Sequence, residues 1–220
     1  MKHIMATASV TAAAPAKCLI TGGYLILERP NTGLVVGLTA RFYTDISEGG
    51  GASRVVLRSP QFDSTIEYEV RDSQKGLQPV ARGEGAANPY FETAFAFTSM
   101  ALSAMGISVA EELRKKGITV TLKADNSFYS HRDYLEARKM AITRANLADG
   151  VPPFRRLDRV AKTGLGSSAA LVTSATAALL AFFGLDPFSN QRHRKLAHEL
   201  AQLAHCVAQG KVGSGFDVCA

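Results

Sequence analysis

The segment Lys162-Thr-Gly-Leu-Gly-Ser-Ser-Ala-Ala170 stands directly before a long stretch rich in alanine and leucine. Its two glycines let the backbone turn sharply and approach a ligand without obstruction by side chains. We expect a helix over residues 167–183, so the two serines stand at the start of that helix. A helix N-terminus presents unpaired N–H groups and the positive end of a dipole, and both favour phosphate. The segment therefore predicts an anion-binding loop.

Two better-known phosphate loops fit this segment poorly. Gly164, Gly166 and Ala169 match the G-x-G-x-x-A pattern of a dinucleotide-binding site, but that pattern requires a buried strand directly before it. Residues 154–162 instead contain four basic residues. The G-x-x-x-x-G-K-[ST] pattern of P-loops does not occur in the sequence. A dinucleotide-dependent oxidoreductase stays an alternative, which an absence of NAD(P)H binding would exclude.

The chain places strands first and helices later. Runs of β-branched and aromatic residues between turn signals predict strands at 18–21, 24–27, 33–39, 41–47, 55–59, 64–70 and 118–124. Residues 71–87 are polar and contain glycine and proline, so we expect a loop there, and a second loop over 145–161. The order shows no regular βαβ alternation, and it therefore predicts an α+β fold.

Apolar residues at helical spacing predict helices at 89–105, around 134–144 and over 167–183. A last helix is expected to begin at Asp186-Pro187, because proline suits the first helical position, and to end at Gly210. Its predicted buried stripe consists of Leu196, Leu200, Leu203 and Val207.

The charge and the polar residues exclude several functions. The net charge of +6 is dispersed, and the one basic cluster, 192–195, is typical of a solvated helix face, so we expect no nucleic-acid partner. The three cysteines have no metal-binding spacing and are expected to be reduced thiols of a cytoplasmic protein. His198-Glu199 does not complete the H-E-x-x-H zinc pattern, and we expect the histidines on helix surfaces.

One segment has the length of a membrane span. Residues 163–185 are uncharged, but serine and threonine interrupt them and most of the rest is alanine. A buried helix is therefore favoured, without membrane insertion. The alanine-rich N-terminus is too weakly apolar to predict a signal peptide.

Three segments together resemble the motifs of the GHMP kinases, a family of small-molecule kinases. Pro15-Ala-Lys-Cys-Leu-Ile-Thr-Gly-Gly-Tyr-Leu-Ile-Leu-Glu28 resembles the first motif, and Thr163-Gly-Leu-Gly-Ser-Ser-Ala-Ala170 resembles the loop that holds the phosphates of ATP. Gly213-Ser-Gly-Phe-Asp217 resembles the loop with the catalytic aspartate. The segments follow the order of the family. Within it, residues 20–28, 126–130 and 209–218 look most like the phosphomevalonate kinases of fungi and plants.

The resemblance implies a ribosomal-protein-S5-like α+β domain over residues 1–220 and an ATP-dependent phosphorylation of 5-phosphomevalonate to 5-diphosphomevalonate in isoprenoid and sterol synthesis. ATP and Mg²⁺ would be the cofactors, and the partners would be small molecules. Mevalonate kinase or another GHMP kinase is the alternative within the family. A non-catalytic nucleotide-binding protein derived from the family is the alternative outside it.

The resemblance also assigns roles to single residues. Lys17 and Asp217 would be catalytic, Lys17 by neutralising charge on the phosphates and Asp217 by orienting the acceptor oxygen. A hydroxyl, more plausibly that of Ser168 than that of Ser167, would reach Mg²⁺. ATP phosphates would contact Gly164, Leu165, Gly166, Ser167, Ser168 and Ala169, and the substrate would contact Ser130, Arg132, Ser214 and Gly215. The structural alternative for Lys17 is a surface lysine. For Ser167 and Ser168 it is a helix cap, and for Asp217 it is a residue of a turn.

Two departures from the family pattern stand out. Ala16 occupies the position before the lysine where the family usually has glycine. The family also has a second, C-terminal domain with a third glycine-rich motif. The residues after Asp217 do not contain such a motif. We therefore expect the N-terminal domain of such a kinase, as a fragment or as an inactive remnant.

Overall fold

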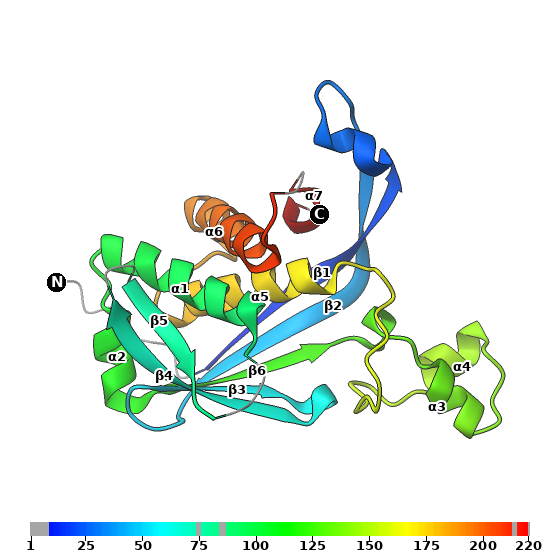
Figure 1. The fold of residues 1–220 in the computed structure, drawn as a ribbon, viewed down its shortest axis with the longest axis horizontal. Coiled ribbons are helices and arrows are strands. Elements are labelled where there is room, and N and C mark those ends of the chain that lie inside the picture. Colours follow the sequence, from blue (N-terminus) through cyan, green and yellow to red (C-terminus); the bar gives the residue numbers. More distant parts are fainter. Residues whose placement is uncertain (1–8, 74–75, 84–86, 213–214, 220) are drawn as a thin grey trace.

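The computed structural model describes residues 9–73, 76–83, 87–212 and 215–219 (Figure 1). Within these residues one six-stranded sheet has the strand order β1-β2-β6-β3-β4-β5. Neighbouring strands are antiparallel, except that β3 and β6 are parallel. The strands are β1 (Ser9–Thr21), β2 (Leu34–Glu48), β3 (Arg54–Ser59), β4 (Ser64–Ser73), β5 (Gly76–Ala81) and β6 (Ile118–Ala124).

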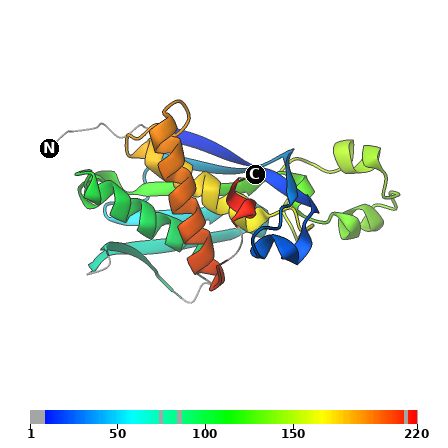
Figure 2. The same cartoon turned by 90° about the horizontal axis from the view of Figure 1, so that it is seen from above.

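Two long helices lie on one face of this sheet, and a third packs over these two helices (Figures 1 and 2). They are α1 (Pro89–Ala104), α5 (Ser167–Phe182) and α6 (Gln191–Gln209), and the shorter α2 (Val109–Lys116) follows α1. The core lies between the helices and the sheet. Along β6 every second residue is buried, as expected for a strand with one face on a core. Together these elements confirm the predicted α+β class.

The helix α5 begins at Ser167, as predicted, and most of its side chains are buried. It lies between the sheet and α6 and contacts β1, β2, α1 and α6. Among the described residues no single helix is long and apolar enough to cross a membrane. Taken together, α1 and α2 have the length and composition of a membrane span, but the angle between the two helices is 117°.

The predicted buried stripe of α6 is confirmed for Leu196 and Leu200, which are partly buried against the core, and wrong for Leu203 and Val207. Its buried residues are Ala197, Ala201, Ala204 and His205, whereas Leu203 is 46% exposed and Val207 51% exposed. Small side chains let α6 pack closely on α1 and α5, and this determines which face turns inward. The helix is also capped by Asn190, whose side chain accepts from Arg192 N and His193 N. The predicted start at Asp186 is wrong, because that carboxylate accepts from Phe188 N and Ser189 N in a separate turn.

Two further predictions about the sheet need correction. The predicted strand 24–27 is part of a 3-10 helix, η1 (Gly23–Leu27), and the predicted strands 33–39 and 41–47 form the single strand β2. The predicted loop 71–87 contains the end of β4 and all of β5, which pair in register. Its polar residues reflect the position of β5 at the edge of the sheet, where Pro79 is also tolerated.

Residues 126–161 form an arm that projects from the sheet (Figure 1). It contains η3 (Asn126–Phe128), α3 (Arg132–Ala137) and α4 (Arg144–Asp149). Two short helices therefore replace the predicted helix around 134–144. The predicted loop 145–161 overlaps α4 at its start, and residues 150–161 have no helix or strand.

Candidate active site

We call residues 162–168 of the predicted anion-binding segment the glycine loop. It leads into the first turn of α5. Gly166 is the N-cap of the helix and has φ +77°, a left-handed conformation that favours glycine. No side chain caps this end of the helix, and Ala170 N donates to Gly166 O at 3.0 Å. The N–H groups of the first helical turn have no partner within the helix itself, so they can serve an anion.

Lys17, on β1, lies directly against this loop. Its backbone N–H donates to Leu165 O at 3.1 Å, next to a register shift between Pro15 and Lys17. A Cβ added to Gly166 would lie 2.7 Å from Lys17 Cε. The φ angle at 166 therefore favours glycine, and a larger residue there would displace the lysine side chain that passes over the loop.

The Lys17 ammonium pairs with Asp217, so the two predicted catalytic residues meet although they are 200 positions apart. Their side chains are 13% and 34% exposed. Lys17 Nζ also lies 4.3 Å from the centre of the Phe216 ring, a distance at which the ring face attracts a cation. The pair thus forms a partly shielded charge cluster beside the glycine loop.

Asp217 is held by the last short helix, α7 (Phe216–Cys219). Val218 N and Cys219 N donate to Gly215 O at 3.1 and 3.3 Å. Gly215 has φ +82°, and a Cβ there would meet the Gln202 amide at 2.9 Å, so α7 sits closely on α6. Gly213 and Ser214, the other residues of this predicted loop, lie outside the described residues.

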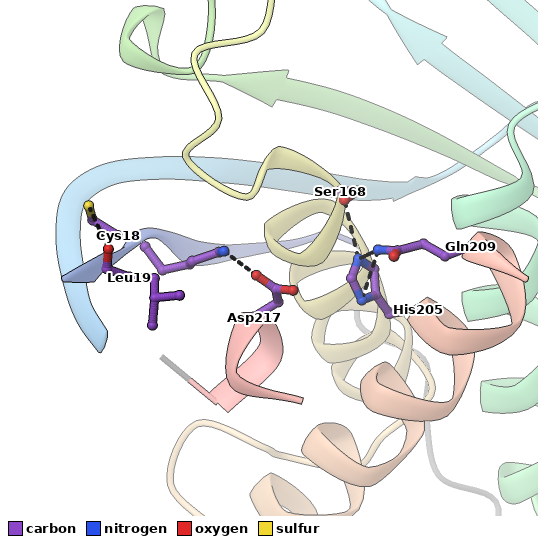
Figure 3. A network of polar contacts seen from close by, with 7 residues as sticks. Cys18, Leu19, Ser168, His205, Gln209 and Asp217 are labelled. Carbon is purple, nitrogen blue, oxygen red and sulfur yellow. Dashed lines mark hydrogen bonds and ion pairs between the residues drawn. The ribbon is translucent and has the colours of Figure 1, made fainter. Parts of the chain in front are cut away.

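A second polar chain joins α5 to α6 (Figure 3). Ser168 Oγ lies 3.2 Å from His205 Nε2, and the Gln209 amide contacts the same imidazole. Burial lowers the pKa of His205; the Asp217 carboxylate opposes this shift, while Lys17 and Lys211 lower the pKa further. The neutral imidazole is therefore favoured at neutral pH.

Sequence reasoning missed His205. The prediction that the histidines lie on helix surfaces is wrong for His205 and His131, which are 6% and 4% exposed. A signal was present, because His205 follows Ala201 by four residues and so shares its helix face. Leu203 and Val207 obscured this signal, since they indicated a different face.

Two cavities flank the cluster. The first, of about 270 Å³, is lined by Ser167 and Ser168 together with Asn88, Tyr90, Tyr129 and Lys162, and we call it the loop-side cavity. The second, of about 320 Å³, is lined by Asp217, His205, Gln202 and Lys211 and by apolar residues of β1 and η1; we call it the aspartate-side cavity. The Ser168–His205 contact joins a residue of one cavity to a residue of the other.

Ser130 and Arg132 are part of the arm instead. Ser130 N donates to Ala161 O at 2.7 Å, and the Arg132 guanidinium, 67% exposed, faces Glu136 at 4.0 Å. Neither is among the residues that line the two cavities. Their contact with a substrate stays a prediction.

The oxygen atoms around the glycine loop indicate what kind of Mg²⁺ site the chain could form. In the described part of the chain, no group of three or more His, Cys, Asp and Glu side chains could hold a metal ion. Mg²⁺ is commonly bound by one or two protein oxygens together with phosphates and water. The Ser168 hydroxyl, which lines the loop-side cavity beside the glycine loop, fits that kind of site and not a closed protein cage.

Comparisons with known proteins bear on the family and on the fold. Residues 144–220 match the family model described as GHMP kinases N terminal domain. The chain is 36% identical to the peroxisomal phosphomevalonate kinase of Arabidopsis thaliana over 96% of its own length and 48% of that protein. It is 35% identical to a phosphomevalonate kinase of Aspergillus fumigatus, over 96% and 49% of the two chains. The chain thus spans about half the length of these relatives.

Solved structures share the fold. The phosphomevalonate kinase of Streptococcus pneumoniae in complex with phosphomevalonate and AMPPNP superposes with a TM-score of 0.59 at 17% identity, over 95% of this chain and 46% of that one. The galactokinase of Lactococcus lactis with galactose gives 0.56 at 14% identity, over 96% and 40%. The predicted fold and the predicted resemblance to the N-terminal portion of the GHMP kinases, within them to the phosphomevalonate kinases of fungi and plants, are both confirmed.

Proposed function

We propose that residues 1–220 are the N-terminal, phosphate-binding domain of an ATP-dependent phosphomevalonate kinase. The reaction moves the γ-phosphoryl group of ATP to the phosphate of 5-phosphomevalonate and yields 5-diphosphomevalonate, in isoprenoid and sterol synthesis. The observation that carries this proposal is the Lys17–Asp217 pair beside the Gly164–Ser168 loop. The names of the plant and fungal relatives support the choice of acceptor.

Phosphoryl transfer depends on positioning and on neutralising charge more than on covalent help from the protein. The glycine loop supplies backbone N–H groups at the start of α5, and Lys17 supplies a positive charge that is already oriented. ATP phosphates would lie along Gly164–Ala169, with the rest of the nucleotide toward the loop-side cavity. Mg²⁺, held by the Ser168 hydroxyl and the phosphates, would neutralise part of the phosphate charge.

The acceptor would enter from the aspartate-side cavity. Gly215, Asp217 and Lys211 line that cavity, and the ammonium of Lys211 suits a phosphorylated substrate. A phosphate acceptor is already ionised near pH 7, so it needs no base to remove a proton. Asp217 therefore acts mainly by holding Lys17 in the path of the transferred group. Ser130, Arg132 and Ser214 stay proposed substrate contacts.

The test is the turnover of the complete protein carrying Asp217→Asn, measured by ADP release that depends on 5-phosphomevalonate. We expect a loss of about 100-fold or more, because the Lys17 ammonium loses its charged partner. The binding of ATP should change little, which a parallel titration would show. Unchanged turnover would remove Asp217 from the site.

A non-catalytic nucleotide-binding protein is the second candidate. It predicts ATP binding without ADP release that depends on substrate, in the complete protein as well. We also propose a cytoplasmic location; since the Arabidopsis relative is named as peroxisomal, imaging of the tagged complete protein is the appropriate check.

A further inference from the structure

We propose that His205 is a positioning residue, which fixes the direction of the Ser168 hydroxyl so that the free lone pairs of its oxygen face the cation that accompanies the nucleotide phosphates. This inference rests on the function proposed above. It assigns a role to a side chain that lies behind the glycine loop. The first evidence is the 3.2 Å contact between His205 Nε2 and Ser168 Oγ (Figure 3).

The imidazole is held from three helices. Ser168 contacts it from α5, the Gln209 amide contacts it from one turn further along α6, and the Tyr90 ring of α1 lies 6.1 Å away between ring centres. His205 itself is only 6% exposed. A side chain enclosed in this way has little freedom to rotate, so it can transmit a fixed direction to its hydroxyl partner.

A serine hydroxyl has one hydrogen and two lone pairs and rotates freely unless a partner fixes it. Serines near helix starts readily turn toward nearby backbone groups. The contact with His205 occupies one hydrogen-bonding direction of Ser168 on the α6 side. The remaining directions then point toward the loop, where a cation bound to phosphate would need a lone pair. The imidazole thus prepares the hydroxyl before a ligand arrives.

The same imidazole also borders the opposite side of the site. It lines the aspartate-side cavity with Asp217 and Lys211, whereas its partner Ser168 lines the loop-side cavity. A histidine that only filled core volume would not need to contact a hydroxyl at the helix start. The hydrogen bond, rather than the volume, is therefore the property to test.

The experiment measures the affinity of the complete protein for AMPPNP by calorimetry, once with Mg²⁺ and once with EDTA. The ratio of the two dissociation constants reports the contribution of the cation. We expect His205→Leu to reduce this ratio about fivefold, the usual worth of one hydrogen bond, and to leave the metal-free affinity nearly unchanged. His205→Gln, whose amide can reach the same hydroxyl, should keep the ratio within about twofold of the unmodified protein. His193→Gln, near the start of the same helix, is the control.

A double-mutant cycle with Ser168→Ala tests whether His205 acts through the hydroxyl. If it does, His205→Leu in the Ser168→Ala background should change the ratio no further. Independent losses that add would overturn the proposal, and so would an equal loss of affinity with and without Mg²⁺. A ratio for His205→Gln as low as that for His205→Leu would also overturn the proposal.

Nitrogen-15 NMR of histidine-labelled protein covers the case in which His205→Leu does not fold. Ser168→Ala should shift the ring-nitrogen signals of His205, and unchanged signals would overturn the proposal. A protein that binds AMPPNP with the predicted coupling but does not phosphorylate 5-phosphomevalonate would sink the proposed function and support the role of His205. A protein that does not bind AMPPNP would overturn both.

Discussion

The cluster around Lys17 and Asp217 and the arm of residues 126–161 are built in opposite ways. The cluster brings together side chains from β1, α5, α6 and α7 that are distant in the sequence. Polar side-chain contacts within the arm are mostly local: Arg132 faces Glu136, Arg155 faces Asp158, and Tyr134 lies between two arginines. Contacts between the arm and the rest of the chain lie at its base, such as Leu157 N to Gln61 O at 2.7 Å. A change of shape in the cluster should therefore spread to several elements, whereas one in the arm should stay local.

Gly166→Ala should produce the largest effect. The new Cβ would lie 2.7 Å from Lys17 Cε, so the lysine must move away from the loop. A misplacement of about 1 Å in a catalytic group can cost about 100-fold in rate, and we expect a loss of that order in kcat/KM of the complete protein. Left-handed alanine would also cost about 1–2 kcal/mol of stability.

Gly164→Ala is the matched control for this change. Gly164 has φ +84°, similar to Gly166, but a Cβ there meets no atom within 4 Å. The two variants therefore share the backbone strain, and only Gly166→Ala displaces Lys17. Equal losses of kcat/KM in both variants would contradict the tight fit of Lys17 over the loop.

The cluster was predictable where a segment of the chain resembles a motif of the GHMP kinases. Lys17, Ser168 and Asp217 were named from three segments, and the structure brings them around one loop. His205 could not be found in this way, because its burial is decided by the packing of Ala197, Ala201 and Ala204 against neighbouring helices. Large residues such as Leu203 dominate a periodicity argument, although close helix packing favours small ones.

The arm and the edge of the sheet show a second limit. Strand β5 was predicted as part of a loop because its own residues give no strand signal. It becomes a strand through its pairing with β4. Ser130 and Arg132 were assigned by resemblance alone. The direction in which a projecting segment turns depends on its contacts with the rest of the chain, such as Leu157 N with Gln61 O at 2.7 Å, and local residue types do not reveal those contacts.

A pH dependence of stability should report on the base of the arm. His131 is buried and donates through Nε2 to Asn126 O at 3.0 Å. Burial lowers its pKa below 6.5; the Asn126 carbonyl opposes this shift and Arg155 adds to it. Below pH 6.5 the unfolded chain therefore binds a proton before the folded chain does, and stability falls as pH falls toward the lowered pKa.

Urea unfolding of the unmodified protein and of His131→Gln at pH 7.5 and 5.5 measures this contribution. His131→Gln should lose less stability than the unmodified protein between the two pH values, because glutamine does not titrate. His193→Gln, at a less buried histidine of α6, is the control and should keep the full pH dependence. Equal pH dependence of all three would contradict a buried, neutral His131.

Arg132→Ala should have the smallest effect and tests the arm against the cluster most directly. The Arg132 guanidinium is exposed and faces Glu136 at 4.0 Å, a surface pair of a kind that contributes about 0–1 kcal/mol. If Arg132 contacts only Glu136, the KM for 5-phosphomevalonate should change by less than about twofold in the complete protein, whereas the proposed substrate contact predicts a larger rise. Lys211→Ala, at the aspartate-side cavity, should raise that KM more, because the lysine lines the cavity assigned to the acceptor. A rise of about tenfold for Arg132→Ala, equal to about 1.4 kcal/mol, would instead support the substrate contact predicted from the sequence and would join the arm to the site.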